Sequence, residues 1–129
     1  MRLYLVRHAE GAAGQPDELR VLTPHGRRQA RELGARLAAE VSPDVVLTSP
    51  LLRARETGEE LARATGSRAE ADARLEPGAT ADDVREAVAG RGENVVVVGH
   101  QPDCGRVAAA LTGGPEPAFP AAGVVAVDL

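Results

Sequence analysis

Short, almost wholly apolar runs alternate along this chain with longer segments whose apolar residues recur at helical spacing, and this alternation restricts the fold more than any other feature. Clear strand-like runs are at 3–6, 45–47 and 95–98, a weaker one lies within 67–73, and a last one is at 123–129. Strands that are apolar throughout are buried on both faces, as in parallel sheets covered by helices. We therefore expect an α/β fold, a single-domain three-layer α/β/α sandwich with a mostly parallel central sheet.

Helix boundary signals fill the intervals between these runs. Thr23-Pro24 and Ser49-Pro50 each place a capping residue before a proline, which predicts helices from there to about Glu40 and to Gly66. Thr80 with Asp83 resembles a capping box and predicts a short helix to residue 90. A fourth helix is expected after 99–102 and ends at 113–114, whereas 10–22 and 75–79 read as loops.

Composition and charge exclude several classes of protein and several kinds of site. The length of 129 residues suits one domain, and a net charge of −4 argues against nucleic acid or an anionic membrane as the main partner. All 15 basic residues are arginine, which excludes a Walker-A loop and Schiff-base chemistry, since both need lysine. A single cysteine, Cys104, allows no internal disulfide, and no apolar run is long enough for a membrane span. We expect a cytoplasmic protein.

Anion-binding and reactive side chains follow three of the predicted strands. Arg7-His8 ends the first strand, Arg53 and Arg55 lie shortly after the second, and His100 ends the 95–98 strand. Ligands of open α/β sheets bind outside the carboxyl ends of the strands, so these groups should meet in one crevice. Because guanidinium binds phosphate oxygens in bidentate fashion, the crevice is a candidate phosphate site.

The same segments carry a family resemblance. The chain resembles the histidine phosphatase superfamily over nearly its whole length, in four ordered motifs: residues 5–10 (LVRHAE), 22–30 (LTPHGRRQA), 49–57 (SPLLRARET) and 98–103 (VGHQPD). Its small size and the GHQPD form are most similar to SixA-type phosphohistidine phosphatases. The resemblance implies a histidine phosphatase (phosphoglycerate mutase-like) domain over residues 1–129.

The resemblance also implies roles for individual residues. His8 would be the nucleophile and would carry a phosphohistidine intermediate, with its other ring nitrogen hydrogen-bonded to fix the tautomer. Arg7 and Arg53 would clamp the phosphoryl oxygens, and His100 would donate a further hydrogen bond to them. Neither a metal nor another cofactor is expected. A metal on the two histidines would need further ligands such as Glu10 or Asp103, and the two arginines would repel the cation.

The general acid is the least defined part of the expected site. Larger members of the superfamily use a Glu or Asp on a loop, and Glu76 and Glu10 are the candidates in this chain. Phosphohistidine needs such an acid less, because its imidazole leaving group is far less basic than an alkoxide. We therefore expect a metal-independent phosphohistidine phosphatase acting on a phosphorylated protein, such as a histidine phosphotransfer domain. The alternatives are a phosphomonoesterase for a small phosphorylated metabolite and a non-catalytic phosphate-binding regulatory module.

Several neighbouring residues have simpler interpretations. Ser49 reads first as a helix cap and only second as a phosphate contact. Arg55 should point outward and pair with Glu59 one turn later. His25 should lie on the surface. Cys104 should be a small buried hydrophobe, because a cysteine-based phosphatase would need an arginine at position 110, where the chain has alanine.

Overall fold

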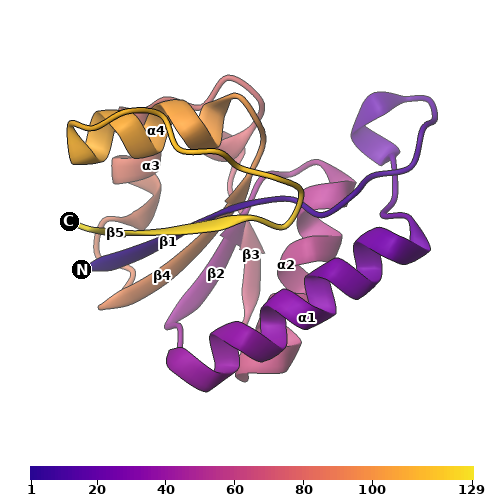
Figure 1. Ribbon diagram of the computed structural model, residues 1–129, viewed down its shortest axis with the longest axis horizontal. Helices are drawn as coiled ribbons and strands as arrows, with labels where there is room; N and C mark the ends of the chain where they lie inside the picture. Colours follow the sequence, from indigo (N-terminus) through magenta and orange to yellow (C-terminus); the bar gives the residue numbers. More distant parts are fainter.

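A five-stranded sheet forms the centre of the computed structural model, which describes all 129 residues (Figure 1). The strands are β1 (Arg2–Arg7), β2 (Val45–Thr48), β3 (Ala69–Ala71), β4 (Asn94–Gly99) and β5 (Val124–Asp128). The helices are α1 (Pro24–Glu40), α2 (Leu52–Thr65), α3 (Ala81–Val88) and α4 (Asp103–Thr112), with single 3₁₀ turns at Asp17–Leu19 and Ala73–Leu75. The strand order is β3-β2-β4-β1-β5; the first four strands are parallel, and β5 runs antiparallel to β1.

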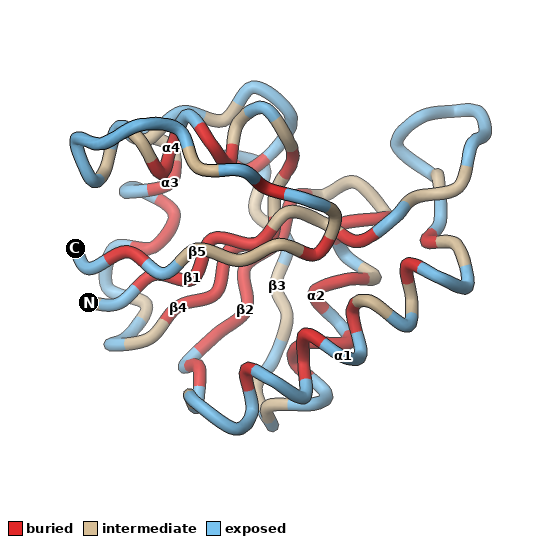
Figure 2. Tube along the Cα trace, in the orientation of Figure 1, coloured by how far each residue is buried: buried red, intermediate tan, exposed pale blue.

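Two apolar layers enclose the sheet and confirm the predicted three-layer sandwich. Helices α1 and α2 cover one face, and α3 and α4 cover the other (Figure 1). Successive residues of β1 alternate between the layers: Leu3 and Leu5 pack toward α3 and α4, whereas Tyr4 and Val6 pack toward α1 and α2. The central strands β1, β2 and β4 are therefore buried on both sides, as Figure 2 shows.

Most predicted helix boundaries agree with the structure. Thr23 caps α1 by accepting a hydrogen bond from the Gly26 N–H, and Thr80 and Asp83 form the reciprocal capping box of α3. Gly113 ends α4 with a left-handed backbone, φ 74°. None of the four helices has both the length and the apolar character needed to cross a membrane.

The predicted start of α2 is wrong. This helix begins at Leu52, its N-cap is Leu51, and no side chain caps it. Ser49 lies in the turn before the helix and is fully buried. Its Oγ accepts a hydrogen bond from the Leu51 N–H and contacts the His100 imidazole. The serine is thus drawn into the interior by a tertiary partner, which the local cap-plus-proline pattern does not reveal.

Candidate active site

A cleft of about 580 Å³ lies at the carboxyl ends of β1 and β4, beside the first turn of α2. All four residues predicted as site residues line it: Arg7, His8, Arg53 and His100. The rest of its lining comes from the segments that follow β1, β3, β4 and α4: Ala9, Glu10, Gly11, Asp17, Arg20, Pro77, Gln101 and Ala121. The topology therefore gathers the predicted groups, as expected for the edge of a parallel sheet.

The His8 imidazole has a defined tautomer. Its Nδ1 lies 2.7 Å from the Ala9 carbonyl oxygen, which can only accept, so Nδ1 carries the hydrogen and donates it. The lone pair is then on Nε2. Burial lowers the pKa of His8 to about 4; the hydrogen bond to Ala9 acts in the opposite direction, and the charges of Arg53 and Arg7 lower the pKa further. At neutral pH the ring is uncharged and its Nε2 is a free base.

His100 lies beside His8, with the ring centroids 5.2 Å apart and the ring planes inclined by 61°. Its side chain is only 4% exposed, and Nε2 lies 2.7 Å from the Ser49 Oγ. Burial lowers the pKa of His100 to about 4, and the neighbouring His8 and Arg53 lower it further. Both imidazoles are therefore neutral hydrogen-bonding groups rather than cations at physiological pH.

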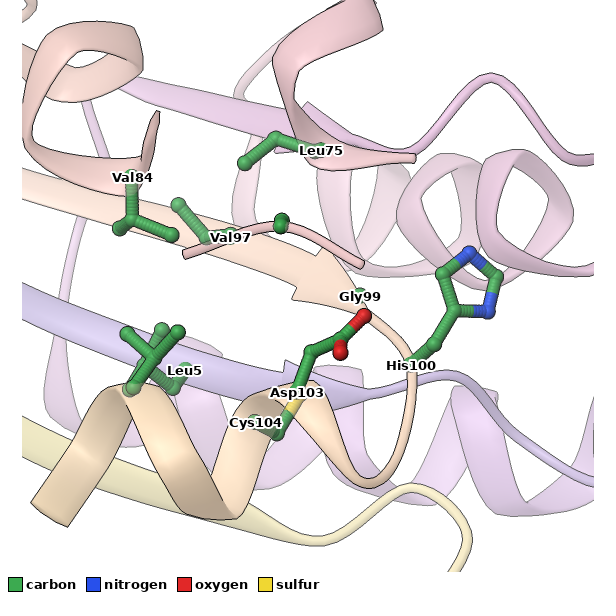
Figure 3. Close-up of a pocket in the computed structure, with 10 residues that line it drawn as sticks. Leu5, Leu75, Val84, Val97, Gly99, His100, Asp103 and Cys104 are labelled. Carbon is green, nitrogen blue, oxygen red and sulfur yellow. The ribbon is translucent and has the colours of Figure 1, made fainter. Parts of the chain in front are cut away.

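His100 also borders a second, apolar cavity on the face of the sheet that α3 and α4 cover (Figure 3). That cavity measures about 20 Å³ and is lined by Leu5, Val97 and Cys104 among others, so it has room for little more than one water molecule. It does not accommodate a substrate. Burial raises the pKa of Cys104 to about 12, which agrees with its predicted role as a small buried hydrophobe.

The two arginines are anchored through the backbone. Arg7 Nη1 donates to the Phe119 carbonyl at 2.9 Å. Arg53, whose side chain is 7% exposed, donates from Nη1 to the Asp17 carbonyl at 2.9 Å and from Nη2 to the Asp17 carboxylate at 3.3 Å. Both guanidiniums are thus fixed at the cleft, and Arg53 is paired with the Asp17 carboxylate.

Asp17 and Arg20 were not anticipated as cleft residues. Both belong to the 10–22 loop, which extends away from the sheet and whose 3₁₀ turn is exposed (Figures 1 and 2). Arg20 Nε donates to the Asp17 carboxylate at 2.9 Å, so this carboxylate bridges Arg20 and Arg53. The opposite charges three residues apart were the only local signal, and they do not indicate that the loop contributes to the lining of the cleft.

The two candidates for the general acid, Glu10 and Glu76, differ in their position relative to the cleft. Glu10 lines the cleft, and its carboxylate accepts a hydrogen bond from the Thr23 hydroxyl at 2.8 Å. Glu76 is exposed and does not line the cleft, although the adjacent Pro77 does. No group of three or more His, Cys, Asp or Glu side chains comes together to form a metal site.

Two surface predictions can also be compared with the structure. His25 is exposed and contacts Gln29, outside the cleft, as expected. Arg55 points outward as predicted, but the predicted ion pair with Glu59 does not form.

Solved structures similar to this chain share its fold. A structure of the protein histidine phosphatase SixA complexed with tungstate superimposes with a TM-score of 0.89 and 28% identity, covering 100% of this chain and 88% of that one. A structure from Agrobacterium tumefaciens named for the phosphohistidine phosphatase SixA gives 0.84 and 27%, with coverages of 98% and 90%.

Sequence relatives give a second comparison. A Klebsiella pneumoniae protein named as a probable phosphoglycerate mutase, GpmB, is 42% identical over 82 residues, which are 58% of this chain but only 37% of that relative. This chain therefore matches little more than a third of the length of that relative. The sequence profile of the histidine phosphatase superfamily (branch 1) matches residues 3–77, more than half of the chain. With the paired imidazoles and arginines at the sheet edge, this match establishes that the chain belongs to the histidine phosphatase superfamily.

Proposed function

We propose that this protein is a phosphatase that hydrolyses phosphohistidine on a protein substrate through a covalent intermediate on His8. The observation that carries the proposal is the hydrogen bond from His8 Nδ1 to the Ala9 carbonyl. It leaves Nε2 as a free base in a cleft that also contains Arg7, Arg53 and His100. A neutral, oriented imidazole beside fixed cations is suited to attack on phosphorus.

The proposed reaction has two steps. In the first, the His8 Nε2 lone pair forms a bond to phosphorus while the N–P bond of the substrate breaks. The substrate imidazole leaves as a neutral ring, because the nitrogen that was not phosphorylated already carries a proton. In the second, water attacks the phosphorus of phospho-His8, which yields inorganic phosphate and restores the free base. In both steps Arg7 and Arg53 balance the charge on the equatorial oxygens, and His100 donates a hydrogen bond to them.

The supply of protons favours phosphohistidine over an ordinary ester. Asp17 is a poor candidate for the general acid, because its carboxyl has a lowered pKa and so stays ionised. Partial desolvation raises this pKa, but the Arg53 charge and the hydrogen bonds from Arg20 and Arg53 lower it by more. Glu76 does not line the cleft, so Glu10 is the one of the two predicted acids that does. An imidazole leaving group can depart already protonated, so a cleft with few proton donors suits it better than an alkoxide. The resemblance to structures named for SixA supports this substrate class.

A small phosphomonoester is the second candidate substrate. The Glu10 carboxyl within the cleft favours it, since it could protonate an alkoxide, and so does the likeness to the protein named as a phosphoglycerate mutase. The third alternative, a phosphate-binding module without turnover, would bind inorganic phosphate but form no product.

The experiment compares wild type with His8→Ala on two substrates in the presence of a chelator. The substrates are a histidine phosphotransfer domain phosphorylated on histidine and glycerol 2-phosphate, an ester whose leaving group is an alkoxide and needs a proton. His25→Ala, which removes an exposed histidine outside the cleft, is the matched control. We expect phosphohistidine turnover in wild type and in the control, and none in His8→Ala. A phosphoenzyme that is acid-labile and base-stable should be trapped in wild type and in His25→Ala, but not in His8→Ala.

The substrate ratio separates the two enzymatic functions. A higher kcat/KM on the phosphorylated domain that is unaffected by Glu10→Gln supports the phosphohistidine assignment. Preference for the ester, lost in Glu10→Gln but not in Glu76→Gln, would assign the protein to the second candidate. Activity that survives in His8→Ala would refute the mechanism, and phosphate binding without turnover would indicate the regulatory module.

A further inference from the structure

The Thr57 side chain connects the helix that carries Arg53 to the loop that carries His8. Thr57 lies on α2 and has no solvent exposure. Its hydroxyl donates to the Arg53 carbonyl at 2.8 Å. Helical Thr side chains commonly form such a bond to the carbonyl four residues before, so this contact alone indicates no special role.

The second contact of the same hydroxyl is not local. The Ala9 N–H, 48 residues away in sequence, donates to Thr57 Oγ1 at 3.0 Å. The Ala9 carbonyl in turn accepts the hydrogen bond from His8 Nδ1. Both polar backbone atoms of Ala9 are therefore occupied, one by Thr57 and the other by the proposed nucleophile.

These bonds form an unbroken series from the Arg53 carbonyl through Thr57 and Ala9 to the His8 ring. Ala9 and Thr57 are both completely buried, so water cannot replace a bond that is lost. The motif at 49–57 contains Thr57 as its last residue, yet none of the predicted site functions requires it.

We propose that Thr57 is a positioning residue that holds the Ala9 backbone so that His8 keeps its Nδ1–H tautomer and its placement relative to Arg53. The proposal rests on the assignment of His8 as nucleophile under the proposed function. Thr57 is not placed in contact with substrate. Its effect should appear in the rate of phosphoryl transfer to His8 rather than in substrate binding, because the arginines that bind the phosphoryl group stay in place.

The test uses Thr57→Val, which replaces the hydroxyl with a methyl group of similar size, and Thr57→Ser, which keeps the hydroxyl. Thr65→Val is the matched control, because Thr65 lies on the same helix and donates to its own fourth preceding carbonyl at 2.8 Å, but contacts no cleft residue. Thr57→Ala removes the hydroxyl without placing a methyl against the Ala9 N–H, and serves as the second variant if the valine protein does not fold.

Two readouts are measured on each variant. With the phosphorylated phosphotransfer domain as substrate, kcat should fall on the order of 10- to 100-fold in Thr57→Val, with KM within about threefold of wild type. Long-range ¹H–¹⁵N NMR spectra of the imidazoles should show the Nδ1–H tautomer of His8 in wild type, Thr57→Ser and Thr65→Val, and a mixture of tautomers in Thr57→Val. Thr57→Ser should recover most of the lost rate.

The two readouts separate the failure of this inference from the failure of the proposed function. Absence of turnover in wild type would refute the proposed function, while the NMR comparison would still test the role of Thr57. A folded Thr57→Val protein with wild-type kcat and an unchanged His8 tautomer would overturn the inference. A rate loss in Thr65→Val equal to that in Thr57→Val would also overturn it, because the effect would then belong to the helix.

Discussion

Acid should destabilise this protein in part through His100, which is nearly inaccessible to solvent and whose pKa is lowered to about 4. The ordinary value for histidine, 6.5, applies to the unfolded chain. Between these two values the unfolded state binds a proton that the folded state does not, so folding is favoured less as pH falls. The contribution is fully present above pH 6.5 and is lost progressively toward pH 4.

The magnitude follows from the size of the shift. Each pKa unit corresponds to about 1.4 kcal/mol, so the free energy of unfolding should fall by about 3 kcal/mol between pH 7 and pH 4 through this imidazole alone. His100→Gln removes the titrating group and keeps a hydrogen-bonding side chain opposite Ser49. Its loss of stability over this interval should be about 3 kcal/mol smaller than that of wild type.

Urea unfolding at pH 7 and pH 4, in buffers without phosphate, measures both losses. Carboxylates also lose stabilising interactions in this interval, but they are common to both proteins and cancel in the comparison. His25→Gln, which removes an exposed histidine, should behave as wild type. Equal losses in wild type and His100→Gln would refute the reasoning, since burial of His100 would then not disfavour its protonation.

Three further outcomes are expected from the same structure. Because the pKa of His8 is about 4, kcat/KM measured from pH 8 downward should stay level to about pH 5 and fall only below it; a fall near pH 6.5 would contradict this. Asp17→Asn removes the carboxylate that occupies Arg53 and should tighten inorganic phosphate binding several-fold by calorimetry, whereas Glu18→Gln, with the same charge change on the same loop, should not. Gly26→Ala should lower the free energy of unfolding, measured in urea, by about 1–3 kcal/mol, because the added Cβ would overlap the backbone of the loop after β1. An unchanged free energy of unfolding would contradict this and show that α1 can move aside.

The sheet, and the presence of the four candidate residues in one cleft, were predictable because their signals are local. Apolar runs identified the three central strands, and His8 and His100 directly follow two of them. The carboxyl ends of parallel strands meet at one edge whatever the details of the connections. Knowledge of the strand positions was therefore enough to bring the two imidazoles together.

The course of the 10–22 loop was not predictable, because tertiary contacts determine it. Gly11 pairs with Leu22 as an isolated bridge, the Leu22 N–H donates to Glu56 on α2 at 2.8 Å, and Asp17 is held by Arg53. Each of these partners is far away in sequence or lies within a segment without periodicity. The role of Ser49 was misread for a related reason, since its helix-start pattern is local and its His100 contact is not.

The strand order has a consequence for how the protein acquires activity during folding. Strand β4, close to the end of the sequence, lies between β1 and β2, which come from the first half of the chain. Pairings between such distant segments form slowly because a long loop must close first. Neither half of the chain can build the cleft alone, because His8 lies in the first half of the sequence and His100 in the second. The proposed phosphatase activity should therefore emerge late upon refolding, when β4 enters the sheet.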